Sequence, residues 1–264
     1  MSSNVCPEHA QLITAWFENL AAFKLAFRMA DFIRYGPEQG WRILLQLLSV
    51  ARTEEERRDA TGELTTLFTF HGDRFIARAE ILAREDETFQ EALREVRFSS
   101  WGMSLGTWRR LNRAAGEPLL PEERFNSGKL DPASIAPRDD KERALAELVP
   151  SPEEVSAMVE ARLVHARTSW ASEEFMAAFT SEREAAETWH LIRDLIAAAP
   201  SEETLGNVAA GPLEDFLSSH GEEWIGEVER FAATDPLFRT TLQGVWQLGM
   251  SDEIYARVVK AAGA

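Results

Sequence analysis

Two histidines and two glutamates stand at matching places in the two halves of this 264-residue sequence. His71 and Glu80 correspond to His220 and Glu229, and they are the titratable residues that recur together. A histidine titrates near neutral pH, and a glutamate can act with it as an acid or a base, so such a pair could transfer a proton. Each glutamate follows its histidine by more than two helical turns, which favours separate structural roles over direct contact.

The surroundings of the glutamates suggest what those structural roles are. A local ion pair does not explain both sites, because Arg84 follows Glu80 by four residues whereas an alanine stands at the corresponding place after Glu229. We therefore expect each glutamate to be partly buried and to accept hydrogen bonds from backbone N–H groups near the next helix start, at Asp86 or Asp235.

Each of these histidines is followed by a glycine, Gly72 or Gly221, and then by acidic residues. Glycine adopts the left-handed conformation that ends many helices, and acidic residues favour the first turn of a new helix. The pattern predicts that one helix ends at each His-Gly pair and that another begins directly after it.

Other residue types offer little for catalysis or for cofactor binding. The spacing of Cys6 and His9 in "CPEH" suits a metal, but no second pair of ligands accompanies it, so we expect no metal site. The sequence contains no glycine-rich phosphate loop with its lysine, and we expect no cofactor. A single cysteine excludes a disulfide within the chain.

The recurring histidines belong to a longer internal repeat. When residues 58–96 are aligned with 207–245, 12 of the 39 positions are identical. About two or three identities would arise by chance at this composition. The tripeptide "GMS" recurs as well, at 102–104 and at 249–251, with a shift that is two residues smaller. This pattern predicts a tandem duplication.

The repeat extends outward to at least 41–116 and 189–263. Between the two copies lies the proline-rich stretch 117–140, which has no periodic pattern and reads as a linker. We therefore predict two repeat units, 1–116 and 141–264, joined by that linker.

Both units are expected to be helical. Apolar residues recur at helical spacing in each copy, and no alternating strand pattern is present. Side chains that can cap helix N-termini mark several helix starts. These predicted caps are Thr53 with Glu56, Ser104, Ser151 with Glu154, Ser181 with Glu184, Asp235 before a proline, and Ser251. The predicted fold is all-α, with the two units arranged as a pseudo-symmetric pair or as a short α-solenoid.

The chain is strongly acidic, with 44 acidic and 28 basic residues and a net charge of −16. From Lys141 onward there are 22 acidic and 10 basic residues, so the second half carries most of the excess. This charge disfavours nucleic acid and anionic membranes as partners, and it suits a basic protein partner or simple solubility. No apolar run approaches a membrane span and no secretory signal is present, so we expect a cytoplasmic protein.

Acidic residues beside aromatic ones indicate where such a partner could bind. Most of the eight tryptophans stand at helical spacing and are expected in the core. Acids next to an aromatic ring in the second half make the best candidate surface. The candidate partner-binding residues are Glu214, Asp215, Glu222, Glu223 and Trp224.

The second half also resembles a known family. The segments "WHLIRDLIAAAP", "AAGPLEDFL" and "IGEVERFAATDPLFRTTLQGVWQLGM" resemble a bacterial helical domain family of unknown function, most clearly over 189–263. The resemblance is weaker over 41–116, where "ATGELTTLF" replaces "AAGPLEDFL". It implies a small bacterial helical module and carries no assigned activity.

Together these observations favour a non-catalytic protein-interaction module. One form of this function is an immunity-type protein that neutralises a basic partner. The alternatives are an enzyme with a site in the cleft between the two copies, and a structural or adaptor protein that uses its outer helix faces.

Overall fold

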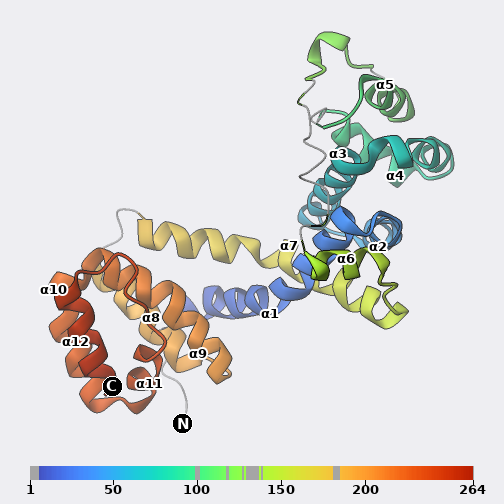
Figure 1. Cartoon of the computed structure of the whole chain (residues 1–264). Helices are drawn as coiled ribbons and strands as arrows, with labels where there is room; N and C mark the ends of the chain where they lie inside the picture. Colours follow the sequence, from blue (N-terminus) through green and yellow to red (C-terminus); the bar gives the residue numbers. More distant parts are fainter. Residues whose placement is uncertain are drawn as a thin grey trace. The chain divides into compact units, whose positions relative to one another are not determined.

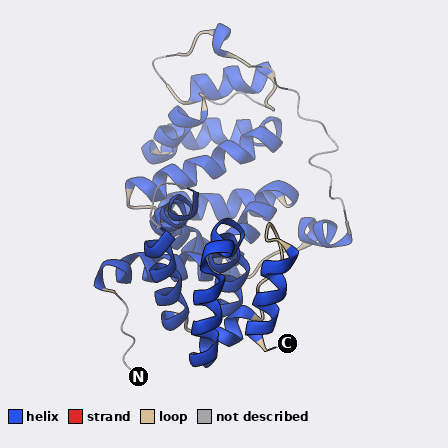
Figure 2. Cartoon of the chain, turned by 90° about the vertical axis from the view of Figure 1, so that its left-hand side faces the viewer, coloured by secondary structure: helices blue, strands red, loops and turns tan. Residues whose placement is uncertain are grey.

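The computed structural model describes residues 6–98, 102–116, 119–126, 128, 137, 139–180 and 185–263. Within these ranges all regular secondary structure is helical and there is no strand (Figures 1 and 2). The predicted all-α class is confirmed. None of the described helices is both long enough and apolar enough to cross a membrane.

The chain forms two compact units. Residues Ala22–Arg167 make up the N-terminal unit, and Met1–Ala21 together with Thr168–Ala264 make up the C-terminal unit. Two long helices, α1 (Pro7–Tyr35) and α7 (Pro152–Thr180), therefore contribute residues to both units. In each case the first part of the helix belongs to the unit built mainly from the other half of the sequence.

The bounds of the compact units differ from those of the predicted repeat units, 1–116 and 141–264. The repeat units themselves remain a prediction from the sequence. Sequence repeats indicate which segments correspond, but they do not indicate with which unit each part of a long helix packs. Much of the predicted linker 117–140 lies outside the described residues.

The N-terminal unit continues from α1 through a series of helices that end in the first part of α7. These are α2 (Pro37–Val50), α3 (Glu54–Glu85), α4 (Glu87–Val96), α5 (Leu105–Ala114), the 3₁₀ turn η1 (Glu122–Arg124) and α6 (Asp140–Glu147). Their apolar faces enclose one core, in which Phe32, Leu44, Phe68 and Trp108 are almost completely buried.

The C-terminal unit has its own core around Trp189, Phe216 and Phe238. Its helices after α7 are α8 (Ala185–Ala198), α9 (Glu202–Val208), the π-helical turn η3 (Ala209–Leu213), α10 (Glu214–Thr234), α11 (Pro236–Leu242) and α12 (Asp252–Ala262). Helix α3 of the N-terminal unit corresponds in sequence to α9, η3 and α10 taken together, so the helices from α2 to α5 follow the same order as those from α8 to α12.

The aromatic centres of the two cores also correspond. The ring of Trp41 stacks on Phe75 with their centroids 5.0 Å apart, and the ring of Trp189 lies 5.8 Å from that of Trp224. Phe75 of α3 and Trp224 of α10 occupy matching places in the repeat. Each core therefore contains a tryptophan at the start of the repeat, packed against an aromatic ring from α3 or from α10.

The helix starts follow the predicted caps. Thr53 and Glu56 form a reciprocal capping box on α3, as do Ser151 and Glu154 on α7. Each of the other predicted caps that the structure describes accepts a hydrogen bond from a backbone N–H in the first turn of its helix. These caps are Ser104 on α5, Asp235 on α11 and Ser251 on α12. The predicted cap formed by Ser181 with Glu184 lies outside the described residues.

Candidate functional site

The predicted helix end at the His-Gly pair is wrong in the C-terminal unit, where α10 continues through His220 and Gly221. In the N-terminal unit α3 consists of two helical segments that meet at a kink at His71, which has φ −136° and ψ 20°, so a break does occur there. Neither Gly72 nor Gly221 is among the described glycines with positive φ, so the expected left-handed glycine is wrong in both units.

The two glycines are instead places of close helix approach. A Cβ added to Gly221 would lie 2.9 Å from Cγ2 of Ile254 on α12, and a Cβ at Gly72 would lie 3.0 Å from Cγ2 of Thr107 on α5. Ile254 and Thr107 occupy matching places, because both lie four residues after the second residue of the repeated "GMS". The glycine therefore leaves room for α5 in the N-terminal unit and for α12 in the C-terminal unit.

The two histidines have different surroundings. Nε2 of His71 donates a hydrogen bond to the carbonyl oxygen of Arg34 at 2.9 Å, and burial lowers the pKa of the ring below 6.5. The ring of His220 lies 5.2 Å from that of Phe216. In the N-terminal unit the histidine therefore ties α3 to the end of α1.

Each recurring glutamate binds an arginine of its own unit. Glu80 accepts two hydrogen bonds from Arg110, at 2.9 and 2.6 Å, and Glu229 accepts two from Arg257, at 2.9 and 2.7 Å. The arginine lowers the pKa of the carboxyl group in both pairs. We expected these carboxylates to accept hydrogen bonds from backbone N–H groups near Asp86 and Asp235. That expectation is wrong, because the donors are arginine side chains.

The ion pairs also bear on whether His71 and Glu80 could act together as an acid and a base. His71 bonds to a backbone carbonyl and Glu80 bonds to a guanidinium, so the two do not form a proton-transfer pair in the N-terminal unit. The matching arginines were detectable in the sequence, since Arg110 and Arg257 are related by the same shift as the repeated "GMS".

A small hollow lies beside the His-Gly pair in each unit. In the C-terminal unit it has a volume of about 440 Å³ and is lined by 217–223, 249–251 and Ile254. The hollow at the matching place in the N-terminal unit is smaller, about 230 Å³. The hydroxyl oxygen of Ser218, on the wall of the larger hollow, is buried without a hydrogen-bond partner in the described part of the chain.

The acidic candidates divide between interior and surface. Glu214 was expected on the surface, but it is only 6% exposed and accepts a hydrogen bond from the backbone N–H of Trp246 at 2.9 Å. Asp215 is partly buried, which raises the pKa of its carboxyl group. Glu222 and Glu223 are exposed, as a recognition surface requires, and both line the larger hollow.

Among the tryptophans, sequence reasoning overlooked the most exposed one of the described chain. Trp224 packs against Trp189 in the core, whereas Trp246 is 73% exposed and its near neighbour Leu248 is 71% exposed. The sequence did contain a signal, because an arginine, Arg97, stands at the place matching Trp246. Because the first copy has an arginine at this place, the core that the two copies have in common does not require Trp246.

Trp246 and Leu248 belong to the segment that joins α11 to α12, which we call the α11–α12 loop (Gln243–Ser251). Leu248 has φ 29°, and it is the one non-glycine residue with positive φ in the described chain. A hollow of about 490 Å³ lies beside this loop, lined by Ala210 of η3 and by Glu214. Strained residues and π-helical turns both occur preferentially at functional sites, which directs attention to this loop.

Charge separates the two units sharply. The C-terminal unit contains 19 acidic and 6 basic residues, whereas the N-terminal unit contains 25 acidic and 22 basic residues. The α11–α12 loop therefore lies on a unit whose net charge accounts for most of the −16 of the chain.

The Cys6–His9 segment has a structural contact in the C-terminal unit. The backbone N–H of Cys6 and Nδ1 of His9 both lie within hydrogen-bond distance of Oδ2 of Asp194, at 3.1 and 2.7 Å. Across the described residues there is no group of three or more His, Cys, Asp or Glu side chains that could hold a metal ion.

Comparison with protein families identifies one part of the chain. Residues 159–264 match the model of a family of unknown function, DUF6869. This match confirms the similarity of the second half to an uncharacterised helical family, and it includes the α11–α12 loop. No curated protein and no solved structure matches the chain.

Proposed function

We propose that the protein is a non-catalytic interaction module whose C-terminal unit binds a basic protein through the α11–α12 loop and the acids beside it. The observation that carries this proposal is the exposure of Trp246 and Leu248 on a unit with a large excess of acidic residues. An immunity-type protein that neutralises a basic toxin in a bacterial cytoplasm is the form of this function that we favour.

The apolar part of the proposed surface has the properties of a binding anchor. Tryptophan contributes more than most residues to binding energy at protein interfaces, because its large ring removes much apolar area from water on binding. Glu214 holds the backbone of Trp246, and Nε2 of Gln247 donates to Asp252 at 2.6 Å. A loop that is fixed before binding loses less conformational entropy when the partner arrives.

The acidic part of the surface would guide the partner. Glu222 and Glu223 line the hollow that also borders Gly249, so the exposed carboxylates share a hollow with one end of the loop that carries Trp246 and Leu248. Opposite charges on a partner would accelerate association in a salt-dependent manner, while the apolar contacts would slow dissociation.

We also propose that the two units descend from one duplicated helical module, as a pseudo-symmetric pair or a short solenoid. The common helix order, the matching Glu–Arg pairs and the glycines at matching helix contacts support this origin. On this view the shared residues maintain the fold, and residues present in one unit alone, such as Trp246, serve function.

Capture of a partner by the full-length chain tests the proposed function. The double variant Trp246→Ala/Leu248→Ala removes the exposed apolar pair, and Trp170→Ala is the matched control because Trp170 is also exposed in the C-terminal unit, at 39%. The proposal predicts a basic protein that the wild type and the control retain and that the double variant loses. Equal retention by the double variant, or retention of acidic proteins alone, would contradict the proposal.

A further inference from the structure

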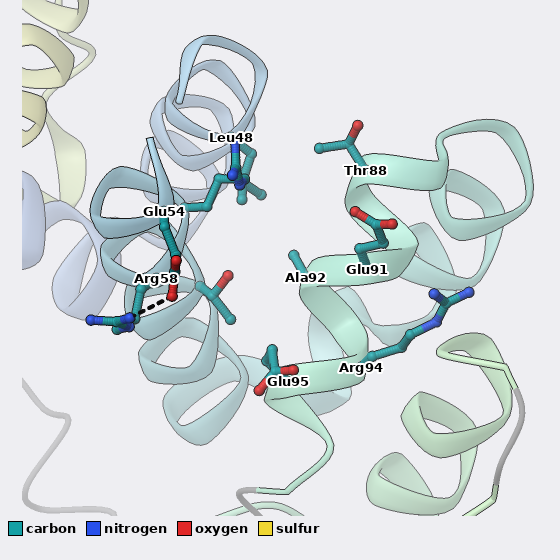
Figure 3. A pocket seen from close by; sticks show the side chains of 10 residues that line it. Leu48, Glu54, Arg58, Thr88, Glu91, Ala92, Arg94 and Glu95 are labelled. Carbon is teal, nitrogen blue, oxygen red and sulfur yellow. Dashed lines mark hydrogen bonds and ion pairs between the residues drawn. The ribbon is translucent and has the colours of Figure 1, made fainter. Parts of the chain in front are cut away.

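A groove of the N-terminal unit lies between the first turns of α3 and the helix α4, with the end of α2 at its base (Figure 3). Its volume is about 570 Å³, which lies in the range of roughly 300–1,000 Å³ that is usual for small-molecule sites. The residues that matter to its chemistry are Leu48, Arg57, Thr61, Glu91, Ala92 and Glu95.

The α4 wall of the groove presents two unpaired carboxylates. Glu91 and Glu95 are exposed, and neither makes a hydrogen bond or an ion pair with any described residue. Figure 3 shows both residues on α4 beside the groove, which Arg94 also lines. The guanidinium of Arg94 donates to the carbonyl of Ala115 and to the side chain of Gln90, at 3.2 Å each.

These carboxylates are unfavourable for the helix that carries them. Glu91 and Glu95 are one helical turn apart, so they repel each other, and Glu95 lies in the last turn of α4, where the helix dipole disfavours negative charge. A departure from local preference without a compensating contact is typical of residues kept for function.

The opposite wall offers a positive charge. Arg57 lines the groove, and one of its terminal nitrogens donates to the carbonyl of Arg52, which leaves its other N–H groups for a ligand. Arg58 is held by Glu54 at 2.8 Å (Figure 3). Between the walls, the nearly buried side chains of Leu48 and Ala92 make an apolar floor.

The C-terminal unit shows that the fold does not require this groove. Gly206 and Gly244 stand at the places matching Arg57 and Glu95. A Cβ on Gly244 would lie 2.9 Å from Cβ of Ala209 and 3.9 Å from Cα of Gly206, so the α11–α12 loop packs closely against α9 and η3 at this place. Charged residues line the groove in the N-terminal unit, and small residues in close contact occupy the corresponding place in the C-terminal unit.

We propose that this groove binds a small zwitterion with an ammonium group at one end and a carboxylate at the other. The ammonium lies between Glu91 and Glu95, and the carboxylate meets Arg57. The hydrocarbon part of the ligand covers Leu48 and Ala92. A dication would leave Arg57 facing a like charge, and a dianion would be repelled by both glutamates, so a zwitterion satisfies the two walls best.

Three probes of equal chain length test this assignment by titration calorimetry on the full-length protein. They are 5-aminopentanoate, which is a zwitterion, cadaverine, which is a dication, and glutarate, which is a dianion. The expected order of affinity is 5-aminopentanoate first, cadaverine weaker, and glutarate without detectable binding. No binding of the zwitterion at millimolar concentration, or equal binding of cadaverine, would overturn the proposal.

Variants then locate the bound probe. Glu91→Gln/Glu95→Gln should weaken 5-aminopentanoate about ten-fold or more, because each charged hydrogen-bond partner becomes neutral. Arg57→Gln should weaken 5-aminopentanoate and leave cadaverine unchanged or tighter. Glu87→Gln is the matched control, since it is exposed on the same helix outside the groove. Equal affinity in the double variant and this control would assign the binding elsewhere and overturn the proposal.

Discussion

Replacement of Gly221 by alanine tests whether this glycine exists to let α12 approach α10. The new Cβ would lie 2.9 Å from Cγ2 of Ile254, a distance at which one of the two helices must move. Cγ2 is attached directly to the branched Cβ of isoleucine and cannot rotate away cheaply, because Ile254 is itself only 6% exposed. Overpacking of this kind destabilises by about 1–3 kcal/mol.

The backbone effect of the same substitution has the opposite sign. Alanine favours a helix interior by about 1 kcal/mol over glycine, so the net effect of Gly221→Ala is a loss of about 1 kcal/mol. Gly226→Ala in the same helix is the matched control, because a Cβ there would meet no atom within 4 Å. We expect Gly226→Ala to raise the free energy of unfolding by about 1 kcal/mol.

Urea unfolding followed by circular dichroism, with the wild type and both variants, gives these values. The difference between the two alanine variants isolates the contact, because the backbone effect is common to both. In an Ile254→Ala background the contact is absent, and Gly221→Ala should then stabilise the unit. The reasoning is refuted if Gly221→Ala stabilises the wild-type protein as much as Gly226→Ala does.

Three further predictions concern charge and strain. Arg110 lowers the pKa of Glu80 below 4.5, so this pair stabilises the folded state above pH 4.5 and the contribution is lost as the pH falls; Glu80→Gln should therefore flatten acid unfolding measured by circular dichroism. Burial raises the pKa of Glu63 above 4.5 despite its contact with Arg162 at 2.8 Å, so its ionisation opposes folding as the pH rises. The stability of Glu63→Gln relative to the wild type should consequently increase between pH 4.5 and 7, and a constant difference would contradict this. Leu248→Gly should relieve a positive φ and raise the thermal midpoint slightly while weakening partner binding, whereas a lower midpoint would show that the loop is not strained.

Helix starts were predictable from sequence because their causes are local. Asp235 caps α11 and Ser251 caps α12 through hydrogen bonds to backbone N–H groups two or three residues away. The sequence contains both partners of such a contact within one turn, so residue types and spacing predict it without knowledge of the tertiary structure.

The helix end predicted at His220 and Gly221 was wrong because the cause of the glycine there is not local. A glycine after a histidine fits a helix end and a close helix contact equally well, and the choice at Gly221 depends on Ile254, which is distant in the sequence. The partner of Glu80 lies 30 residues away, at Arg110. The sequence indicates this ion pair only when the two repeats are aligned on the repeated "GMS", which places Arg110 opposite Arg257.

The candidate surface was located only in part. Glu222 and Glu223 were expected to be exposed and are exposed, but Glu214 turns inward because the α11–α12 loop supplies it with a backbone donor. Composition assigns a tryptophan to the core by default, and the sequence signal against this at Trp246 was the arginine at the matching place, Arg97.

The most direct test of the central claim is the dissociation constant of the captured basic partner for the wild type and for Trp246→Ala, measured at low and at high salt. Our account predicts that Trp246→Ala weakens binding by about 30-fold or more at both salt concentrations, as loss of an interface anchor does, and that higher salt slows association of both proteins. An unchanged dissociation constant in the folded Trp246→Ala protein would contradict the claim that the C-terminal unit binds through the α11–α12 loop.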